Sequence, residues 1–445
     1  MLKFYLMTDT HFYSTAHHGL SDDIGQITRN ESGAIIDAAF EAFIAQDETD
    51  ILLLCGDVTC NGRACEHEGF IEKLRRVKAA GKRVYMIPAT HDYGQVSITD
   101  TPQNGRKEDA VYRCELRGMY EEFGFSEAIA EYDSMTYLVQ LAPGYRLLCL
   151  NDDGDGRSYC GYSVEQLAWI IDQIAKAKGE GQFIFAMTHH PVLPPSPIYP
   201  IISRRDMLGG FEQTSAALAD AGLRFIFTGH THMQNIAVMT TEKGNKFYDI
   251  NTGSLIGYPA PYRKVTVGDE SMTVETCFVD DFDWDLQGKT AKQYLMDSFD
   301  ALLVEILRSA AEDVDRFAEL AGGFSVEKET VYKYKTALKL GGKLLNSLTF
   351  GGVGTLLCCR RRVDKSVRGR KLNEAIVEII RNAYEGDEPY SGDTPAGKAI
   401  LAFAERIGQL LRLVTRKSLP FDLTELVASV IYDDTPDNFA VLPRY

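Results

Sequence analysis

No apolar run in the sequence reaches the roughly 18 residues that a membrane-spanning helix needs. The opening run, Leu2–Met7, ends at once in Thr8 and Asp9, so it is too short for the apolar region of a secretory signal. We therefore expect no membrane partner, and we predict a cytoplasmic protein.

Cysteine pairing motifs are also missing. The sequence has nine cysteines, an odd number, and none of them are spaced as C-x-x-C. We interpret them as reduced thiols of a cytosolic protein rather than as a disulfide framework.

An excess of basic charge is absent as well. Lysine and arginine total 47 against 63 aspartates and glutamates, which gives a formal net charge of −16. Non-specific nucleic-acid affinity comes from neutralising phosphates, so this balance argues against nucleic acid as a partner. It does not exclude a small anionic substrate, because a bound metal creates its own local positive field.

Two segments look like ligand-binding loops but lack a decisive residue. The glycine-rich stretch 350–354 has no lysine after it, so it is a weak candidate for a phosphate loop. The acidic stretch 151–156 begins like a calcium loop, but the twelfth position is Tyr162 instead of glutamate. We interpret the second segment as an acidic turn.

The hydrophobic pattern divides the chain in two. Alternating strand-like and helix-like runs fill residues 1–285, and their order favours a layered α/β sandwich. Apolar residues recur at helical spacing through 290–445, which predicts a helical C-terminal domain acting as a cap or an interaction surface. The helices expected there span 294–321, 326–348, 367–384, 396–414 and 423–432.

Aspartate and histidine gather where predicted strands end. All nine histidines lie at or before position 232, which places the ligand chemistry in the first domain. Side chains beyond the carboxyl ends of strands can converge on one crevice. The groups are Asp9-x-His11, Gly56-Asp57, His91-Asp92, His189-His190-Pro191 and Gly229-His230-Thr231-His232.

This mixture of residues suits divalent metal chemistry on phosphate. Carboxylate and neutral imidazole hold borderline metals such as Mn, Fe or Zn. Two such cations about 3.5–4 Å apart can clamp the attacking and leaving oxygens of an in-line displacement. A carboxylate must bridge them, and Asp57 is the candidate, with Gly56 allowing a sharp turn before it.

The ordered motifs resemble the calcineurin-like metallophosphoesterase family over about residues 1–280. The resemblance implies a four-layer α/β/β/α sandwich, here followed by an all-α C-terminal domain, and a site for two divalent metal ions. It implies that Asp9, His11, Asp57 and His232 hold one metal, and that Asp57, His189 and His230 hold the other.

The same resemblance implies roles in catalysis. His91 would protonate the leaving oxygen or stabilise the transition state, and Asp92 would orient it. Stretches such as Asn251–Ser254 are similar to the bacterial cyclic-nucleotide phosphodiesterase branch, some members of which carry a helical C-terminal domain. We therefore expect a phosphodiesterase that acts by in-line attack of metal-activated hydroxide on a small phosphorylated substrate, with a cyclic nucleotide as the candidate.

Several alternatives stay open at this stage. His190 could be a metal ligand, but neighbouring side chains at a strand end point in opposite directions, so a contact to substrate or to a ligand is favoured. A binding scaffold that has lost catalysis is the competing function. The helical domain could also form a homo-oligomer.

Thr90 departs from the family pattern, which has asparagine before the third-motif histidine. A threonine hydroxyl is a shorter and weaker ligand than an amide oxygen, so we predict weaker occupancy of the second metal site, not its loss. The variant Thr90→Asn should bind the second metal more tightly when metal stoichiometry is measured at limiting metal. Equal affinity in both proteins would contradict this prediction.

Overall fold

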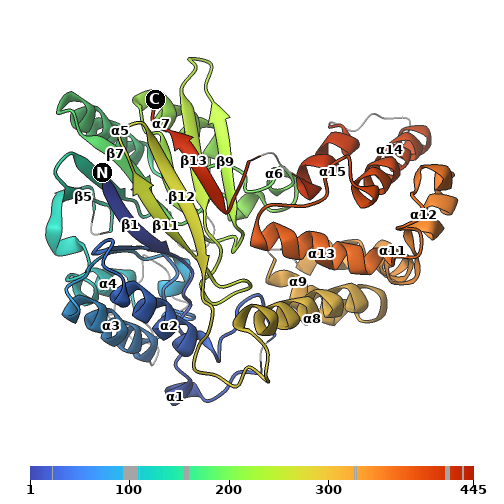
Figure 1. The fold of residues 1–445 in the computed structure, drawn as a ribbon, viewed down its shortest axis with the longest axis horizontal. Helices are drawn as coiled ribbons and strands as arrows, with labels where there is room; N and C mark the ends of the chain where they lie inside the picture. Colours follow the sequence, from blue (N-terminus) through green and yellow to red (C-terminus); the bar gives the residue numbers. More distant parts are fainter. Residues whose placement is uncertain are drawn as a thin grey trace.

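A computed structural model describes residues 1–22, 24–93, 109, 111–133, 135–154, 160–324, 326, 328–415, 421–432 and 435–445. Two mixed β-sheets form its centre (Figure 1). The six-stranded sheet has the order β13 (Phe439–Pro443), β12 (Ser271–Phe278), β11 (Pro261–Val267), β1 (Leu2–Met7), β2 (Ile51–Cys55) and β3 (Arg83–Ile87). The seven-stranded sheet has the order β4 (Ala128–Glu131), β5 (Tyr137–Ala142), β6 (Tyr145–Cys149), β7 (Phe183–Met187), β8 (Phe225–Thr228), β10 (Lys246–Asn251) and β9 (Asn235–Thr240).

The two sheets pack face to face through aromatic side chains. The ring of Phe4 on β1 stacks on Phe185 of β7 at 5.3 Å between centroids, and it meets the edge of Phe227 on β8 at 5.4 Å. All three rings are fully buried. Burying a phenylalanine contributes roughly 1.5–3 kcal/mol, so this contact fixes the distance between the sheets that carry the site.

Helices cover the outer faces of both sheets, which confirms the predicted four-layer sandwich. Ile35 and Phe43 of α2 (Ser32–Ala45) are fully buried in the core shared with the first sheet. Ile170 and Ile174 of α5 (Val164–Gly179) are buried against the second sheet. The outer helices are α2 (Ser32–Ala45), α3 (Ala64–Ala79), α5 (Val164–Gly179) and α7 (Phe211–Ala221), with shorter elements at α1 (Thr15–His18), α4 (Arg113–Met119), α6 (Tyr199–Ile202), η1 (Thr90–Asp92), η2 (Phe125–Glu127) and η3 (Arg204–Asp206).

The C-terminal region is mainly helical, as expected, and this helical segment lies beside the sandwich (Figure 1). One long predicted helix is instead broken at Asp313, whose carboxylate accepts hydrogen bonds from the N–H groups of Asp315 and Arg316 and so begins a new helix. Among the described residues no helix is both long and apolar enough to cross a membrane. The elements are α8 (Ala291–Glu312), α9 (Val314–Gly322), α10 (Lys328–Lys333), α11 (Lys335–Ser347), α12 (Phe350–Leu356), η4 (Arg360–Arg362), α13 (Leu372–Glu385), α14 (Pro395–Thr415) and α15 (Leu423–Ile431).

The prediction that the chain is helical to its end is wrong for the last residues. Strand β13 returns to the sandwich and pairs antiparallel with β12, where Met272 faces Leu442 and Val274 faces Ala440. The alternation of exposed and buried residues along β13 matches a strand with one face on the core. Pairing across such a sequence separation leaves no local pattern by which it could be predicted.

A buried arginine joins this returning tail to the sandwich. The Arg263 side chain is fully buried and donates hydrogen bonds to the backbone oxygens of Asn251 (2.8 Å) and Asp437 (2.5 Å). Burial lowers the pKa of Arg263 to about 10, and the negative charge of Asp437 opposes that shift. The Asp437 carboxylate also accepts a 2.6 Å hydrogen bond from the N–H of Ile236.

Replacing Asp437 with alanine should therefore lower the free energy of unfolding by about 1.5–3 kcal/mol, because its buried carboxylate accepts hydrogen bonds from the N–H groups of Ile236 and Asp387 and is one of two negative charges near Arg263. Urea denaturation measures the change. The exposed Asp269→Ala is the control and should stay within about 0.5 kcal/mol of the unmodified protein. A loss below about 1 kcal/mol in Asp437→Ala would contradict the assignment.

Candidate metal centre

The predicted ligands follow parallel strands whose carboxyl ends meet at one edge. Strands β1, β2 and β3 run parallel in the first sheet, and β7 and β8 run parallel in the second. Several candidate ligands hold the left-handed backbone conformation that is uncommon outside glycine. Their φ angles are 50° at Asp9, 35° at His11, 49° at Asp57, 67° at His230 and 58° at His232. Such strain gathers at functional sites, where the surrounding structure supports it.

Asp9, His11 and His232 form the first group. Their ligand atoms lie within 4.8 Å of one another. Nε2 of His232 is 3.3 Å from Oδ1 of Asp9, and Nε2 of His11 is 3.6 Å from the same oxygen. The two Nε2 atoms are 3.2 Å apart. Both nitrogens and the carboxylate oxygen therefore point at one place, as ligands of a single cation would.

Asp57, His189 and His230 form the second group, again within 4.8 Å. Nε2 of His189 lies 3.1 Å from Oδ2 of Asp57. The same Asp57 oxygen is 3.9 Å from Nε2 of His11, a member of the first group. Asp57 thus stands between the two groups, where a bridging carboxylate is expected.

The donor atoms fit metal ions rather than each other. Oδ1 of Asp9 and Nε2 of His189 are buried and have no hydrogen-bond partner. Both atoms nevertheless lie close to other candidate ligand atoms, at 3.3 Å from Nε2 of His232 and 3.1 Å from Oδ2 of Asp57 respectively. Nδ1 of His189 lies 2.8 Å from the carbonyl oxygen of Cys55. Because a carbonyl only accepts, Nδ1 carries the proton, and Nε2 presents its lone pair to the cluster when the ring is neutral. Metal-binding histidines commonly have this arrangement.

Burial and neighbouring charges together set the ionisation of the cluster. Burial would raise the pKa of Asp9, but the charge of His189 and the nearby rings of His11 and His232 hold it well below its usual range. Burial opposes ionisation of Asp57 too, and His189 and His91 keep its pKa well below normal. Burial lowers the pKa of His11 to about 4. The site therefore presents two carboxylates that stay ionised inside the protein, a strongly favourable environment for cations.

His91 stands at the open side of the cluster. Its side chain is exposed, and its ring is 4.8 Å from that of His11. Nδ1 lies 2.9 Å from the carbonyl oxygen of Cys60, and the backbone N–H donates to Oδ1 of Asp57 at 2.9 Å. The Cys60 carbonyl thus holds Nδ1 of the His91 ring, and Nε2 of that ring is left for other contacts beside the cluster.

The expectation that Asp92 orients the His91 ring is wrong. The buried Asp92 carboxylate accepts hydrogen bonds from the N–H groups of Thr59 (2.8 Å) and Ala89 (2.9 Å) and from the Thr59 hydroxyl (2.8 Å). Burial and the nearby Asp57 raise the pKa of Asp92 to about 6. Asp92 therefore braces the loop after Asp57, and the carbonyl of Cys60 orients the ring instead.

His190 contacts Asp152, which the sequence analysis interpreted only as part of an acidic turn. Nδ1 of His190 is 2.9 Å from Oδ1 of Asp152, and the His190 N–H donates to the other oxygen at 2.8 Å. The His190 ring lies 4.2 Å from the ring of His230. His190 is thus a buried neighbour of a candidate ligand. The position of Asp152, just past the end of β6, was the signal that could have revealed it.

Asp206 and Asn251 contact the last motif, which carries His230 and His232. Oδ1 of Asp206 lies 3.9 Å from Nε2 of His230, which the sequence did not predict. Asn251 donates to the carbonyl of Gly229 at 2.7 Å and so fixes the loop that carries both histidines of the last motif. Thr90 begins the short turn η1 and is half-buried.

Comparison with known proteins places this site in a family. The model of the calcineurin-like phosphoesterase family matches residues 2–234. A probable glycerophosphodiester phosphodiesterase from Arcobacter nitrofigilis is 27% identical over 142 residues, which are 32% of this chain and 42% of that relative. This chain therefore covers less than half of the relative's length.

Solved structures with similar folds include a dimetal phosphatase from Danio rerio and a purple acid phosphatase from yellow lupin. The first has 12% identity and a TM-score of 0.47, covering 63% of this chain and 97% of the other. The second has 12% identity and a TM-score of 0.43, covering 62% of this chain and 51% of the other.

The chain belongs to the calcineurin-like phosphoesterase family. Family membership and the two side-chain clusters indicate a dinuclear site for divalent metals.

Gly56 leaves room for the His189 ring. Its φ is 92°, and a Cβ at this position would lie 2.5 Å from Nδ1 of His189. Gly56→Ala should displace that ring and remove about one metal equivalent per chain, as measured by elemental analysis. Gly81→Ala is the matched control, because Gly81 has a φ of 81° and open space around it. Equal metal content in both variants would contradict the arrangement.

Proposed function

We propose that the protein hydrolyses a phosphodiester at a dinuclear centre held by Asp9, His11, Asp57, His189, His230 and His232. The observation that carries this proposal is the position of Asp57 between two ligand groups, with His91 beside it. The carboxylate and imidazole mixture favours Mn, Fe or Zn. When bound, such cations neutralise phosphate oxygens and lower the pKa of a bound water to about 7.

His91 acts on the leaving oxygen in this proposal. Its ring is held by the carbonyl of Cys60, and Nε2 is the atom from which a proton would reach the departing alkoxide. The exposure of the side chain makes it accessible to substrate in the cleft. A positioned proton donor of this kind contributes typically 10²–10⁴-fold to rate.

A diester is favoured over a monoester by the relative named as a probable glycerophosphodiester phosphodiesterase. A cyclic nucleotide remains a candidate on sequence resemblance alone. The competing function, a binding scaffold without catalysis, rests only on Thr90. The convergence of the six candidate metal ligands favours hydrolysis over the scaffold.

The activity test uses bis(4-nitrophenyl) phosphate, 4-nitrophenyl phosphate and cyclic AMP with Mn, Fe or Zn added. We expect turnover of the aryl diester above the monoester. His91→Ala should lower kcat by about 10²–10⁴-fold while metal content stays unchanged. Asp57→Asn should lose both activity and bound metal, because the bridging carboxylate is gone.

His17→Ala is the matched control, since this histidine is exposed and lies on α1 outside the two ligand groups. It should keep full activity and metal content. Failure to hydrolyse any phosphoester with all three metals supplied would favour the scaffold. A drop in metal content in His91→Ala equal to that in Asp57→Asn would contradict the separate role of His91.

A further inference from the structure

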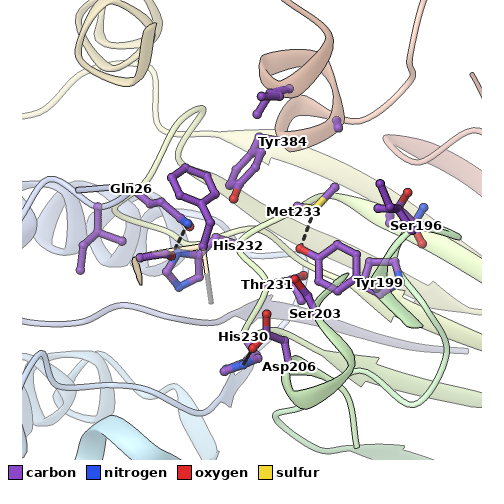
Figure 2. A pocket seen from close by; sticks show the side chains of 18 of the residues that line it. Gln26, Ser196, Tyr199, Ser203, Asp206, His230, Thr231, His232, Met233 and Tyr384 are labelled. Atoms are coloured by element: carbon purple, nitrogen blue, oxygen red, sulfur yellow. Dashed lines mark hydrogen bonds and ion pairs between the residues drawn. The ribbon is translucent and has the colours of Figure 1, made fainter. Parts of the chain in front are cut away.

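A large cavity joins the metal centre to the helical segment. It has a volume of about 1200 Å³ and reaches His11, Asp57 and His91 at one end. Figure 2 shows His230 and Asp206 on one side and Tyr384 of α13 facing them from the other. The sandwich alone does not form this cavity, because residues of α8, α9 and α13 build its far wall.

The two ends of the cavity differ in chemistry. The metal end is lined by carboxylates and imidazoles. The wall formed by α8, α9 and α13 is mainly apolar. The charged side chains on these helices, Arg316 and Glu319, pair with each other at 2.7 Å, and Glu388 lines the cavity just beyond α13. The apolar residues of this wall are Leu302, Leu320, Phe324, Ile379, Ile380 and Ala383.

Direct contacts hold the helical wall against the sandwich. The ring of Phe299 on α8 stacks on Tyr258 at 5.9 Å. The Tyr294 hydroxyl donates to Glu31 at 2.7 Å, and Gln26 donates to the carbonyl of Gly323 at 2.5 Å. The cavity is therefore a built part of the fold, partly open to solvent, rather than a gap between independent bodies.

The size of the cavity sets a bound on its occupant. Sites that enclose a drug-sized ligand measure about 300–1,000 Å³. A volume of about 1200 Å³ exceeds what a phosphate with a small polar group would fill. Water in contact with the apolar far wall is unfavourable, so an occupant with hydrocarbon there gains affinity.

We propose that the substrate is a phosphodiester that carries a hydrocarbon arm, with the phosphate at the metal centre and the arm against the wall formed by α8, α9 and α13. This inference rests on the proposed function and adds a substrate class to it. The helical segment is then a specificity element, since it supplies the surface that recognises the arm.

A homologous series of alkyl 4-nitrophenyl phosphodiesters tests the inference. Hydrolysis adds the oxygen of water to phosphorus and releases 4-nitrophenol in every member, so only the methyl, butyl, hexyl or octyl arm differs. Burying each methylene should raise kcat/KM by about three- to fourfold, mainly through KM. An arm of ethylene glycol units as long as octyl should give no such rise.

Two variants of the cavity wall should test recognition of the hydrocarbon arm separately from catalysis at the metal centre. Ala383→Trp fills part of the cavity and should lower kcat/KM for the octyl diester by about tenfold or more while the methyl diester keeps its rate. Ile379→Gln should weaken the octyl preference without filling space. Ala337→Trp is the matched control, because Ala337 is exposed on α11 and outside the cavity lining.

The outcomes distinguish the two proposals. Turnover that is equal for methyl and octyl diesters overturns the hydrocarbon arm and leaves the proposed phosphodiesterase standing. If Ala383→Trp lowers kcat/KM equally for every substrate, the methyl diester included, the proposed hydrocarbon arm is also contradicted. No turnover of any diester with metal present overturns the proposed function on which this inference rests.

Discussion

Burial of the Asp9 and Asp57 carboxylates beside imidazole rings is the interaction on which the site depends. A lone ionised carboxylate is very costly to bury, yet both side chains are almost fully enclosed. Nearby histidines keep them ionised, and the buried Oδ1 of Asp9 and Nε2 of His189 lack hydrogen-bond partners. Cations at this position would satisfy both charge and unpaired atoms, which explains why the fold gathers such groups at its centre.

The surrounding structure holds this arrangement in place at some conformational cost. Candidate ligands follow parallel strands and adopt left-handed backbone angles, each costing of order 1–3 kcal/mol. Hydrogen bonds offset that cost: Asp92 accepts from the loop after Asp57, and Asn251 secures the loop of the last motif. Packing of Phe4 between the sheets then fixes the spacing of the two sets of loops.

Much of the sandwich could be predicted because its signals are local. The apolar runs of β1 and β2 each end one residue short of an aspartate, Asp9 and Asp57, so pattern and motif agree. The bracing role of Asp92 could not be predicted, because its partners lie far away in sequence. For Asp152, only its place past the end of a strand hinted at the contact with His190. The return of β13 and the cavity wall of α13 likewise depend on long-range packing, which hydrophobic periodicity does not encode.

The most direct test of a dinuclear centre is anomalous diffraction from crystals grown with Mn²⁺. The account predicts two peaks about 3.5–4 Å apart, both in contact with Asp57, one beside His11 and His232 and the other beside His189 and His230. A saturated crystal with no peak at this site, or with peaks that do not touch Asp57, would contradict the claim that one carboxylate joins two metal ions.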